Sequence, residues 1–257
     1  MNSVVLPLYG PLSVHLYGIC VAAGIVLTLF LAHRSSFVAD RIPTHLLLPL
    51  VNAVILAGII GGRLLFVCTE WDEMHSWGDV VAVWDGGFSV LGSIIAGLVT
   101  IFFFVRHHRL SLLATLDVAG LYGPLVQAFG RIGCFFAGCC HGTPTNAWWA
   151  VTYTSPLVNP DCVPLHPTQL YNSTLLFALF LIQLHLVRRA PPAGLIGAFG
   201  FGGLGFTRFI TDFWRADHVP WLLGLSVSQL LSLILLGFAV GIGVTSARRT
   251  RRQSSSL

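Results

Sequence analysis

The chain has 257 residues, of which 55% are hydrophobic and only 9% are charged, and its mean hydropathy is +0.80. An average soluble domain carries about 25% charged residues, so this composition excludes a soluble globular protein and predicts an integral membrane protein. The basic residues number 14, all of them arginine, against 10 acids, which gives a formal charge of +4. At about 20 apolar residues per spanning helix, little chain remains for a separate soluble domain. We therefore expect one domain over residues 1–257.

Apolar segments follow one another along the chain, and each is long enough to cross a hydrocarbon core about 30 Å thick. We predict an all-α fold with seven transmembrane helices, which places the two termini on opposite sides of the membrane. No cleaved signal peptide is expected, because the first twelve residues contain no basic residue ahead of an apolar core. The segments lie at about 14–33, 46–68, 87–105, 112–135, 170–187, 193–214 and 222–245.

Clustered arginines indicate the orientation of these segments. They occur in the connections 34–41, 106–109, 188–189 and 248–252, which all fall on one side of the seven-span arrangement. The positive-inside bias identifies that side as the cytoplasm, so the N-terminus is predicted to be periplasmic and the C-terminus cytoplasmic. The longest outward connection, about 137–167, contains five prolines and no membrane-length apolar run. We interpret it as a small periplasmic cap.

Three arginines inside apolar segments lie at nearly the same predicted depth. Arg63, Arg131 and Arg208 stand about four to six residues from the outer ends of their segments, within roughly 10 Å of one interface. A charged side chain at this depth is costly unless it is paired or hydrated. Independent snorkelling toward the lipid headgroups would satisfy each arginine separately. We favour a shared pocket for an anionic group such as a lipid phosphate, where Gly130 and Gly133 allow a ligand to approach Arg131 closely.

The segment that carries Arg208 also carries an acid. Asp212 follows Arg208 by four residues and Arg215 follows it by seven, so the three are expected to share one helix face and Arg208 can pair with Asp212. Two interpretations stay open for this pair. It could lock the helix against a neighbour, or it could orient Arg208 toward a substrate.

Polar side chains also stand at the outward ends of other segments. His15 and Tyr17 begin the first segment, and His166 opens the fifth. Histidine exchanges protons near neutral pH, which makes His15 and His166 candidates for proton transfer. For a tyrosine alone, a place in the interfacial aromatic belt is the simpler explanation.

Short motifs containing these residues recur in one order along most of the chain. They cover 13–18, 61–64, 84–92, 130–142, 166–171, 205–215 and 228–232. In this order and spacing they resemble the bacterial prolipoprotein diacylglyceryl transferases. The resemblance implies an inner-membrane, multi-pass enzyme that moves diacylglyceryl from phosphatidylglycerol to the lipobox cysteine of a prolipoprotein and releases glycerol phosphate. Its implied partners are these two substrates and the bilayer, and the sequence contains no nucleotide or nucleic-acid signature.

The resemblance also implies roles for individual residues. Arg131 matches the arginine that contacts the phosphatidylglycerol headgroup, and Arg208 matches the second important arginine. Tyr17 and Gly142 match an important tyrosine and a functional glycine, and Asp212 stands where the family usually has glutamate. We predict as catalytic residues Arg131, Arg208, Tyr17, His141 and His166, and as substrate-binding residues Arg131, Arg63, Gly130, Gly133, Gly142, Arg208, Asp212 and His15.

One departure from the family concerns proton transfer. The family commonly has histidine in a Ser-x-His-Gly-Gly stretch, where this chain has Leu91. Leucine cannot exchange a proton. If the chain is a transferase of this kind, its base is unassigned, and His141, His166 and His15 are the candidates. Alternatively, a cationic pocket that lowers the pKa of the acceptor thiol would make a strong base unnecessary.

Other departures concern polar side chains near the key arginine. The family's asparagine and loop glutamate are Cys134 and Cys139 here, and the glutamate that follows the Gln-Leu-Tyr triplet is Asn172. Several polar positions have therefore changed together. Two alternatives to the family activity follow from them: a diacylglyceryl transferase with a different acceptor, and a catalytically inactive phospholipid-binding membrane protein.

Four cysteines lie in or near the outward connection: Cys134, Cys139, Cys140 and Cys162. Zinc sites usually have separated pairs of ligands, which this crowded spacing matches weakly, so we expect no metal and no cofactor. A disulfide from Cys139 or Cys140, with Cys162 as a candidate partner, would fit an oxidising periplasm, whereas a vicinal pair bonded to itself would be strained. A nucleophilic thiolate beside a positive charge and plain loop packing are the remaining alternatives.

Overall fold

The computed structural model describes residues 4–7, 13–71, 78, 80, 89–153 and 162–254. The chain divides into two compact units. The first unit comprises Met1–Pro7, Val14–Arg34 and Leu116–Leu257, and the second comprises Leu8–Ser13 and Ser35–Thr115. Most of the acidic connection after the second predicted span lies outside the described residues, as do residues 154–161 of the predicted cap.

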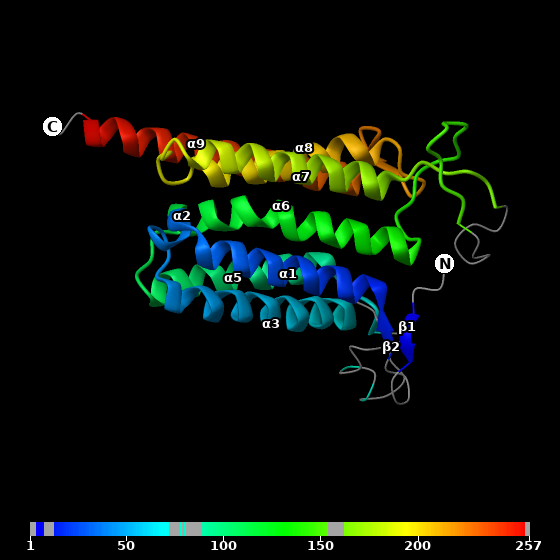
Figure 1. Ribbon diagram of the computed structural model, residues 1–257, viewed down its shortest axis with the longest axis horizontal. Coiled ribbons are helices and arrows are strands. Elements are labelled where there is room, and N and C mark those ends of the chain that lie inside the picture. The colour runs from blue at the N-terminus through cyan, green and yellow to red at the C-terminus, as the bar shows by residue number, and fades with distance from the viewer. Residues whose placement is uncertain are drawn as a thin grey trace. The chain divides into compact units, whose positions relative to one another are not determined.

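Five long helices belong to the first unit: α1 (Leu16–Arg34), α6 (Leu112–Ala137, in this unit from Leu116 on), α7 (Thr168–Val187), α8 (Leu195–Asp212) and α9 (Val227–Ser254). Helix α8 packs along both α7 and α9, and the three lie side by side in Figure 1. Ala128 of α6 packs against Leu176 and Leu179 of α7, and all three side chains are buried. This apolar core holds α6 beside α7.

Polar contacts join α6 to the start of α8. Asp117 is fully buried, and its carboxylate accepts hydrogen bonds from the backbone N–H groups of Gly194 and Gly197, both at 2.8 Å. These are N–H groups at a helix N-terminus, which an acid stabilises. A Cβ atom added at Gly200 would lie only 2.1 Å from the carbonyl oxygen of Gly120. Glycine therefore lets α6 and α8 approach closely, as in many membrane helix pairs.

The second unit contains α2 (Ser36–Ala39), α3 (Thr44–Thr69) and α5 (Val90–His107). Helices α3 and α5 cross at two glycines, because a Cβ atom at Gly92 would lie 2.3 Å from the carbonyl oxygen of Gly61. Near this crossing, the Ser93 hydroxyl donates to the carbonyl of Gly58 at 2.8 Å. Ser89 caps α5 by accepting from the backbone N–H of Gly92.

Short strands complete the described residues. Strands β1 (Val4–Pro7) and β2 (Ser13–His15) form one two-stranded sheet, and β3 (Pro220–Leu222) pairs antiparallel with β4 (Leu225–Ser226). The β3–β4 turn passes through Leu223 and Gly224, both at positive φ. The predicted start of the last span near residue 222 is therefore wrong, because this hairpin occupies the chain until α9 begins at Val227.

The long helices match the predicted apolar segments one for one, with ends shifted by a few residues, which confirms the predicted helical fold. Five described helices are long and apolar enough to cross a membrane: α1, α3, α6, α7 and α9. The apolar part of α5, Gly92–His107, is shorter. Large apolar side chains such as Phe103 and Ile234 are about two-thirds exposed, at 65% and 68%, and need lipid around them. Several apolar helices thus indicate a multi-pass membrane protein.

The connection between α6 and α7 has no helix among its described residues, 138–153 and 162–167. Gly138, at φ +75°, ends α6. Val151 and Leu165 exchange two backbone hydrogen bonds of 3.0 Å, and the side chains of Leu165 and Tyr153 are buried. The described part of this connection is thus folded back on itself beside the start of α7.

Candidate active site

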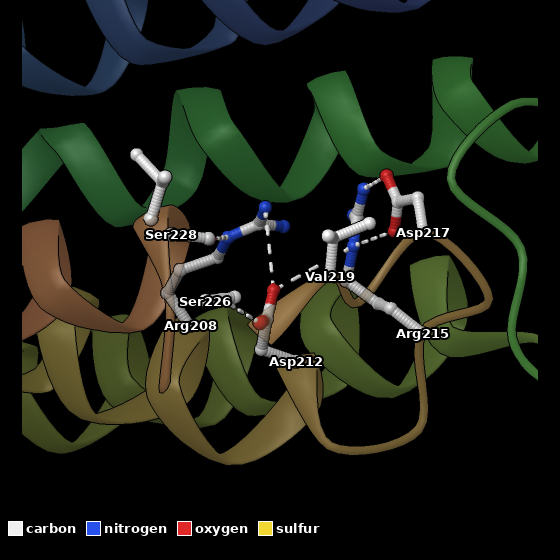
Figure 2. Close-up of a pocket in the computed structure, with 8 residues that line it drawn as sticks. Arg208, Asp212, Arg215, Asp217, Val219, Ser226 and Ser228 are labelled. Atoms are coloured by element: carbon white, nitrogen blue, oxygen red, sulfur yellow. Dashed lines mark hydrogen bonds and ion pairs between the residues drawn. The ribbon is translucent and has the colours of Figure 1, made fainter. Parts of the chain in front are cut away.

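A pocket of about 270 Å³ lies where α8 ends, within the first unit (Figure 2). Asp212, the last residue of α8, is buried there, and its Oδ1 atom lies 3.6 Å from Nη2 of Arg208 and 3.7 Å from Nε of Arg215. Figure 2 shows both guanidinium groups on the same side of this carboxylate. The pocket is lined by Arg208, Asp212, Arg215, Asp217, Val219, Ser226, Val227 and Ser228.

The predicted pairing of Arg208 with Asp212 is confirmed, but the shared helix face with Arg215 is wrong. Helix α8 ends at Asp212, and Arg215 lies in the following turn. The turn brings Arg215 back to the same carboxylate, because its backbone N–H donates to the Asp212 carbonyl at 3.1 Å. One buried acid thus holds two arginines, one from α8 and one from the turn that follows it.

The second oxygen of Asp212 is also occupied. Its Oδ2 atom lies 3.0 Å from Nδ1 of His218 and accepts a short hydrogen bond from the Ser226 hydroxyl of β4. Ser226 is itself fixed, because its backbone N–H donates to Oε1 of Gln229. The β3–β4 hairpin therefore immobilises Asp212, and the geometry supports both interpretations of the ion pair, the locking of the helix end and the orientation of Arg208.

Arg208 is held from a second side by α9. Its Nε donates to the Ser228 hydroxyl at 2.6 Å, and its side chain remains 24% exposed. The positive charges of Arg131 and Arg215 both act on Arg208. Arg131, on α6, is half-buried, and no acidic side chain of the described residues forms an ion pair with it. An anion bound here would relieve the repulsion among these three cations.

Arg215 binds a second acid at the mouth of the pocket. Its Nε donates to Oδ1 of Asp217 at 2.7 Å, and its Nη2 pairs with the other oxygen of the same carboxylate. Burial alone would lower the pKa of the Arg215 guanidinium. The hydrogen bond to Asp217 and the negative charge of Cys140 have a larger opposite effect, so the pKa is raised. Arg215 therefore stays charged.

Gly142 occupies the tightest position of the predicted site. A Cβ atom there would lie 2.5 Å from Cβ of His166 and 2.6 Å from the carbonyl oxygen of Trp214. Its backbone N–H donates to the His166 carbonyl at 2.8 Å, and the next N–H, of Thr143, donates to Trp214 at 2.9 Å. Glycine is required because the start of α7 and the turn after α8 meet at this point.

The other two predicted glycines differ from each other. A Cβ atom at Gly133 would lie 3.0 Å from Cδ2 of Tyr17, so this glycine lets α1 approach α6. A Cβ atom at Gly130 would have open space within 4 Å. Tyr17 is 45% exposed, and the charge of Arg131 acts on it. Tyr17 and Arg131 thus lie at the same end of α6.

The predicted histidines occupy different surroundings. Nδ1 of His166 lies 3.0 Å from the Tyr171 hydroxyl, which also accepts a hydrogen bond of 2.6 Å from the Trp149 indole. Nδ1 of His141 lies 3.3 Å from the Gly142 carbonyl. Both rings are half-buried. His15 is the last residue of β2, and its side chain lies outside the described part of the chain.

Two further positions named from the sequence lie in the second unit. Arg63 of α3 is buried, donates through Nε to the Val80 carbonyl at 3.2 Å and lies over the Phe66 ring. Its place in a pocket shared with Arg131 and Arg208 stays a prediction. Leu91 is in the first turn of α5, and its side chain is outside the described residues.

Three of the four cysteines named from the sequence come together. The Sγ atoms of Cys134, Cys139 and Cys140 lie within 4.8 Å of one another, and Cys162 is not part of this group. All six cysteines are free thiols, so the disulfide considered as one alternative is not formed. Hydrogen bonds from the Cys134 and Cys139 thiols, with the charge of Arg215, lower the pKa of the Cys140 thiol. The same hydrogen bonding raises the pKa of Cys139.

Comparisons with known proteins agree on one family. The family model described as prolipoprotein diacylglyceryl transferase matches residues 3–245. The chain is similar to proteins named phosphatidylglycerol–prolipoprotein diacylglyceryl transferase: 31% identical to that of Clostridium tetani, covering 98% of this chain and 100% of the relative, and 30% identical to that of Parasynechococcus marenigrum, covering 95% and 94%. The relative from Streptococcus sanguinis is 31% identical, covering 95% and 94%. The chain belongs to the prolipoprotein diacylglyceryl transferase family.

Membership of the prolipoprotein diacylglyceryl transferase family confirms the resemblance found in the sequence, while several contacts of the pocket were not predicted. Ser228 stood inside a quoted motif without an assigned role. Ser226 and His218 carried no local signal, because only the hairpin and the turn after α8 bring them to Asp212. Asp117 could have been noticed, since an acid in an apolar segment needs a partner.

Proposed function

We propose that this protein transfers the diacylglyceryl group of phosphatidylglycerol to the lipobox cysteine thiol of prolipoproteins and releases glycerol phosphate. Its relatives are named phosphatidylglycerol–prolipoprotein diacylglyceryl transferase, which states the donor lipid, the acceptor and the group transferred for those proteins. The proposal rests on the pocket in which one buried carboxylate, Asp212, fixes Arg208 and Arg215. The charge of Arg131, for which the described residues offer no ion-pair partner, also acts on Arg208. Such a group of cations suits the phosphate of an anionic lipid.

In the proposed reaction, Arg131 and Arg208 bind the phosphodiester of phosphatidylglycerol. The acceptor thiolate attacks the glycerol carbon that bears the phosphate, a C–S bond forms, and the C–O bond to phosphate breaks with its electron pair. Negative charge then develops on the leaving glycerol phosphate, where oriented guanidinium groups stabilise it. Asp212 and Ser228 contribute by keeping Arg208 in one orientation, since a fixed donor need not reorganise during the reaction.

Proton acceptance is proposed for His141 and His166. A carbonyl beside Nδ1 of His141 favours the tautomer with the proton on Nδ1, which leaves Nε2 as a base. His166 is oriented by its contact with Tyr171. Tyr17 and the glycines Gly130, Gly133 and Gly142 are proposed to shape the headgroup site. Arg63 and His15 are proposed substrate-binding residues because both are predicted to lie near the periplasmic face of the membrane, as Arg131 and Arg208 are.

We also propose that the chain acts as one domain with seven spans in the bacterial inner membrane. The N-terminus and the cap at about 137–167 would face the periplasm and the C-terminus the cytoplasm, as the arginine clusters favour. Reporter fusions test this arrangement. A fluorescent protein at the C-terminus should mature, and alkaline phosphatase fused there should be inactive; the reverse pattern would contradict the orientation.

The transfer reaction is tested with purified protein, phosphatidylglycerol and a lipobox peptide. Wild type should increase the peptide mass by one diacylglyceryl group and release glycerol phosphate. Arg131→Ala and Arg208→Ala should each be slower by roughly 100- to 1,000-fold, the usual cost of an oriented charge-stabilising donor. Arg189→Ala is the matched control, because Arg189 is exposed at the end of α7.

Three outcomes of this assay contradict the proposal in different ways. Release of glycerol phosphate without peptide modification indicates a different acceptor. No release under conditions in which a relative is active indicates a phospholipid-binding protein. Equal loss in Arg189→Ala would show that the arginine substitutions act through general charge and not through the pocket.

A further inference from the structure

The three clustered thiols are not used by the proposed reaction. Cys134 lies in the last turn of α6, and Cys139 and Cys140 follow the helix end. We propose that Cys134, Cys139 and Cys140 bind a thiophilic cation, Zn²⁺, whose fourth coordination position takes the thiol of the acceptor substrate. The spacing of these cysteines in the sequence matches a zinc site only weakly, but the turn after α6 brings all three sulfur atoms close together.

The separations of the sulfur atoms fit a metal with little movement. Zinc binds thiolate at about 2.3 Å, so sulfurs at three corners of a tetrahedron are about 3.8 Å apart. The three Sγ atoms lie within 4.8 Å of one another, and the Cys139 thiol donates to the Cys134 carbonyl at 3.8 Å. A contraction of about 1 Å would therefore suffice for coordination.

The backbone of the cysteine turn is held by the first turn of α7. Thr168 donates through its hydroxyl to the Cys140 carbonyl at 2.8 Å, and Gln169 donates through Nε2 to the Cys139 carbonyl at 2.7 Å. Both donors are buried, at 2% and 1% exposure. Cys140 has φ +60°, which only a few per cent of non-glycine residues adopt. A strained residue held by buried hydrogen bonds is typical of a functional site.

The charges around the cluster suit a complex of this kind. Three thiolates and one Zn²⁺ carry a net charge of about −1, and a fourth thiolate would make it about −2. The charge of Arg215 acts on Cys140, and the charge of Arg131 acts on Cys134. Both arginines therefore compensate the negative charge of the metal complex, as outer groups of metal sites commonly do.

The cluster is also accessible from one side. Cys139 is exposed, and Cys134 and Cys140 are partly exposed. Three protein ligands with one open position are typical of catalytic zinc sites, whereas structural sites use four protein ligands. Soft thiolate ligands select zinc over magnesium or calcium.

The role of the fourth position rests on the proposed function. A thiol that coordinates Zn²⁺ loses its proton to solvent, so this route does not need the histidine base proposed above. The sulfur then forms the C–S bond as the C–O bond to glycerol phosphate breaks. No oxidant or reductant is needed. The metal would make the acceptor thiolate available although Leu91 replaces the family's histidine.

Cobalt substitution tests the site without relying on activity. We would strip the purified, reduced full-length protein of metal in detergent and titrate it with Co²⁺. One Co²⁺ per chain should bind and give thiolate-to-cobalt charge-transfer absorption. Cys134→Ser, Cys139→Ser and Cys140→Ser should lose this band, and Cys68→Ser, on α3, is the matched control that should keep it. Gel filtration of each variant verifies folding.

A second titration tests the fourth position. Adding a lipobox peptide with its cysteine should change the visible d–d bands of bound cobalt, whereas the same peptide with serine should not. The site would be overturned if folded wild type lacks the charge-transfer band. It would also be overturned if the band persists in the triple serine variant, in which Cys134, Cys139 and Cys140 are all replaced by serine. An unchanged d–d spectrum with the cysteine peptide would overturn the substrate role.

The same proteins separate this inference from the proposed function. If the triple serine variant modifies the lipobox peptide at the wild-type rate, the metal inference fails and the transferase proposal stands. If cobalt binds as expected but wild type loaded with Zn²⁺ transfers nothing, the site stands and the transferase proposal fails.

Discussion

Replacing Gly142 by alanine is the sharpest structural test of the site. The added Cβ atom would meet Cβ of His166 at 2.5 Å and the Trp214 carbonyl oxygen at 2.6 Å, whereas real atoms of this kind stay well above 3 Å apart. Backbone on both sides must therefore move by about 1 Å. This movement acts on two hydrogen bonds, Gly142 to His166 and Thr143 to Trp214, and on Arg215, whose backbone pairs with Gly142.

The expected cost follows from these contacts. Overpacking costs about 1–3 kcal/mol, and each weakened hydrogen bond adds about 0.5–1.5 kcal/mol. Gly142→Ala should therefore lower the free energy of unfolding by about 2–6 kcal/mol, a fall in Tm on the order of 10 °C for a chain of this size. A displacement of Arg215 by about 1 Å should also reduce transfer by on the order of 100-fold.

Thermal unfolding in detergent and the lipobox-peptide assay measure both effects. Gly237→Ala is the matched control, because Gly237 lies in α9 with open space around its Cα, so its Tm and rate should stay within error of wild type. If Gly142→Ala is as stable and as active as Gly237→Ala, the close packing around Gly142 does not hold the site together. A loss of activity with an unchanged Tm would show that Gly142 contacts substrate and does not serve packing.

Three further predictions concern the ion pairs of the pocket and the thiol of Cys140. Asp212→Asn should lower the free energy of unfolding by about 3 kcal/mol in thermal unfolding, because Arg208 loses the carboxylate that it pairs with and the buried Arg215 keeps only Asp217; a loss below about 1 kcal/mol would contradict the ion-pair network. Arg208→Lys keeps the charge but loses the forked guanidinium that bonds Ser228, so kcat/KM for phosphatidylglycerol should fall by roughly 10- to 100-fold; an unchanged value would show that charge alone suffices. The lowered pKa of Cys140 raises its thiolate fraction at neutral pH, so in reduced, metal-free protein iodoacetamide should label Cys140 at pH 7 faster than Cys68, and equal rates would refute the lowering.

The sequence alone determined the helices and the family. Apolar runs of membrane length leave the backbone no alternative to helix inside lipid, so each predicted segment corresponds to a helix. The pairing of Arg208 with Asp212 was equally local, because residues four apart on a helix face each other. The family was recognised from short motifs that occur in a fixed order along the chain. Composition and hydrophobic periodicity alone would not have identified it.

Tertiary structure decided what surrounds those local features. Arg215 returns to Asp212 only because α8 ends there, and Ser226 reaches the same carboxylate only through the β3–β4 hairpin. The spacing of the cysteines matched a metal site only weakly, because a turn at positive φ cannot be recognised from spacing. That turn brings the three sulfur atoms close together. Local patterns determine helices because backbone hydrogen bonds and side-chain periodicity are local, whereas a pocket depends on contacts between residues far apart in the chain.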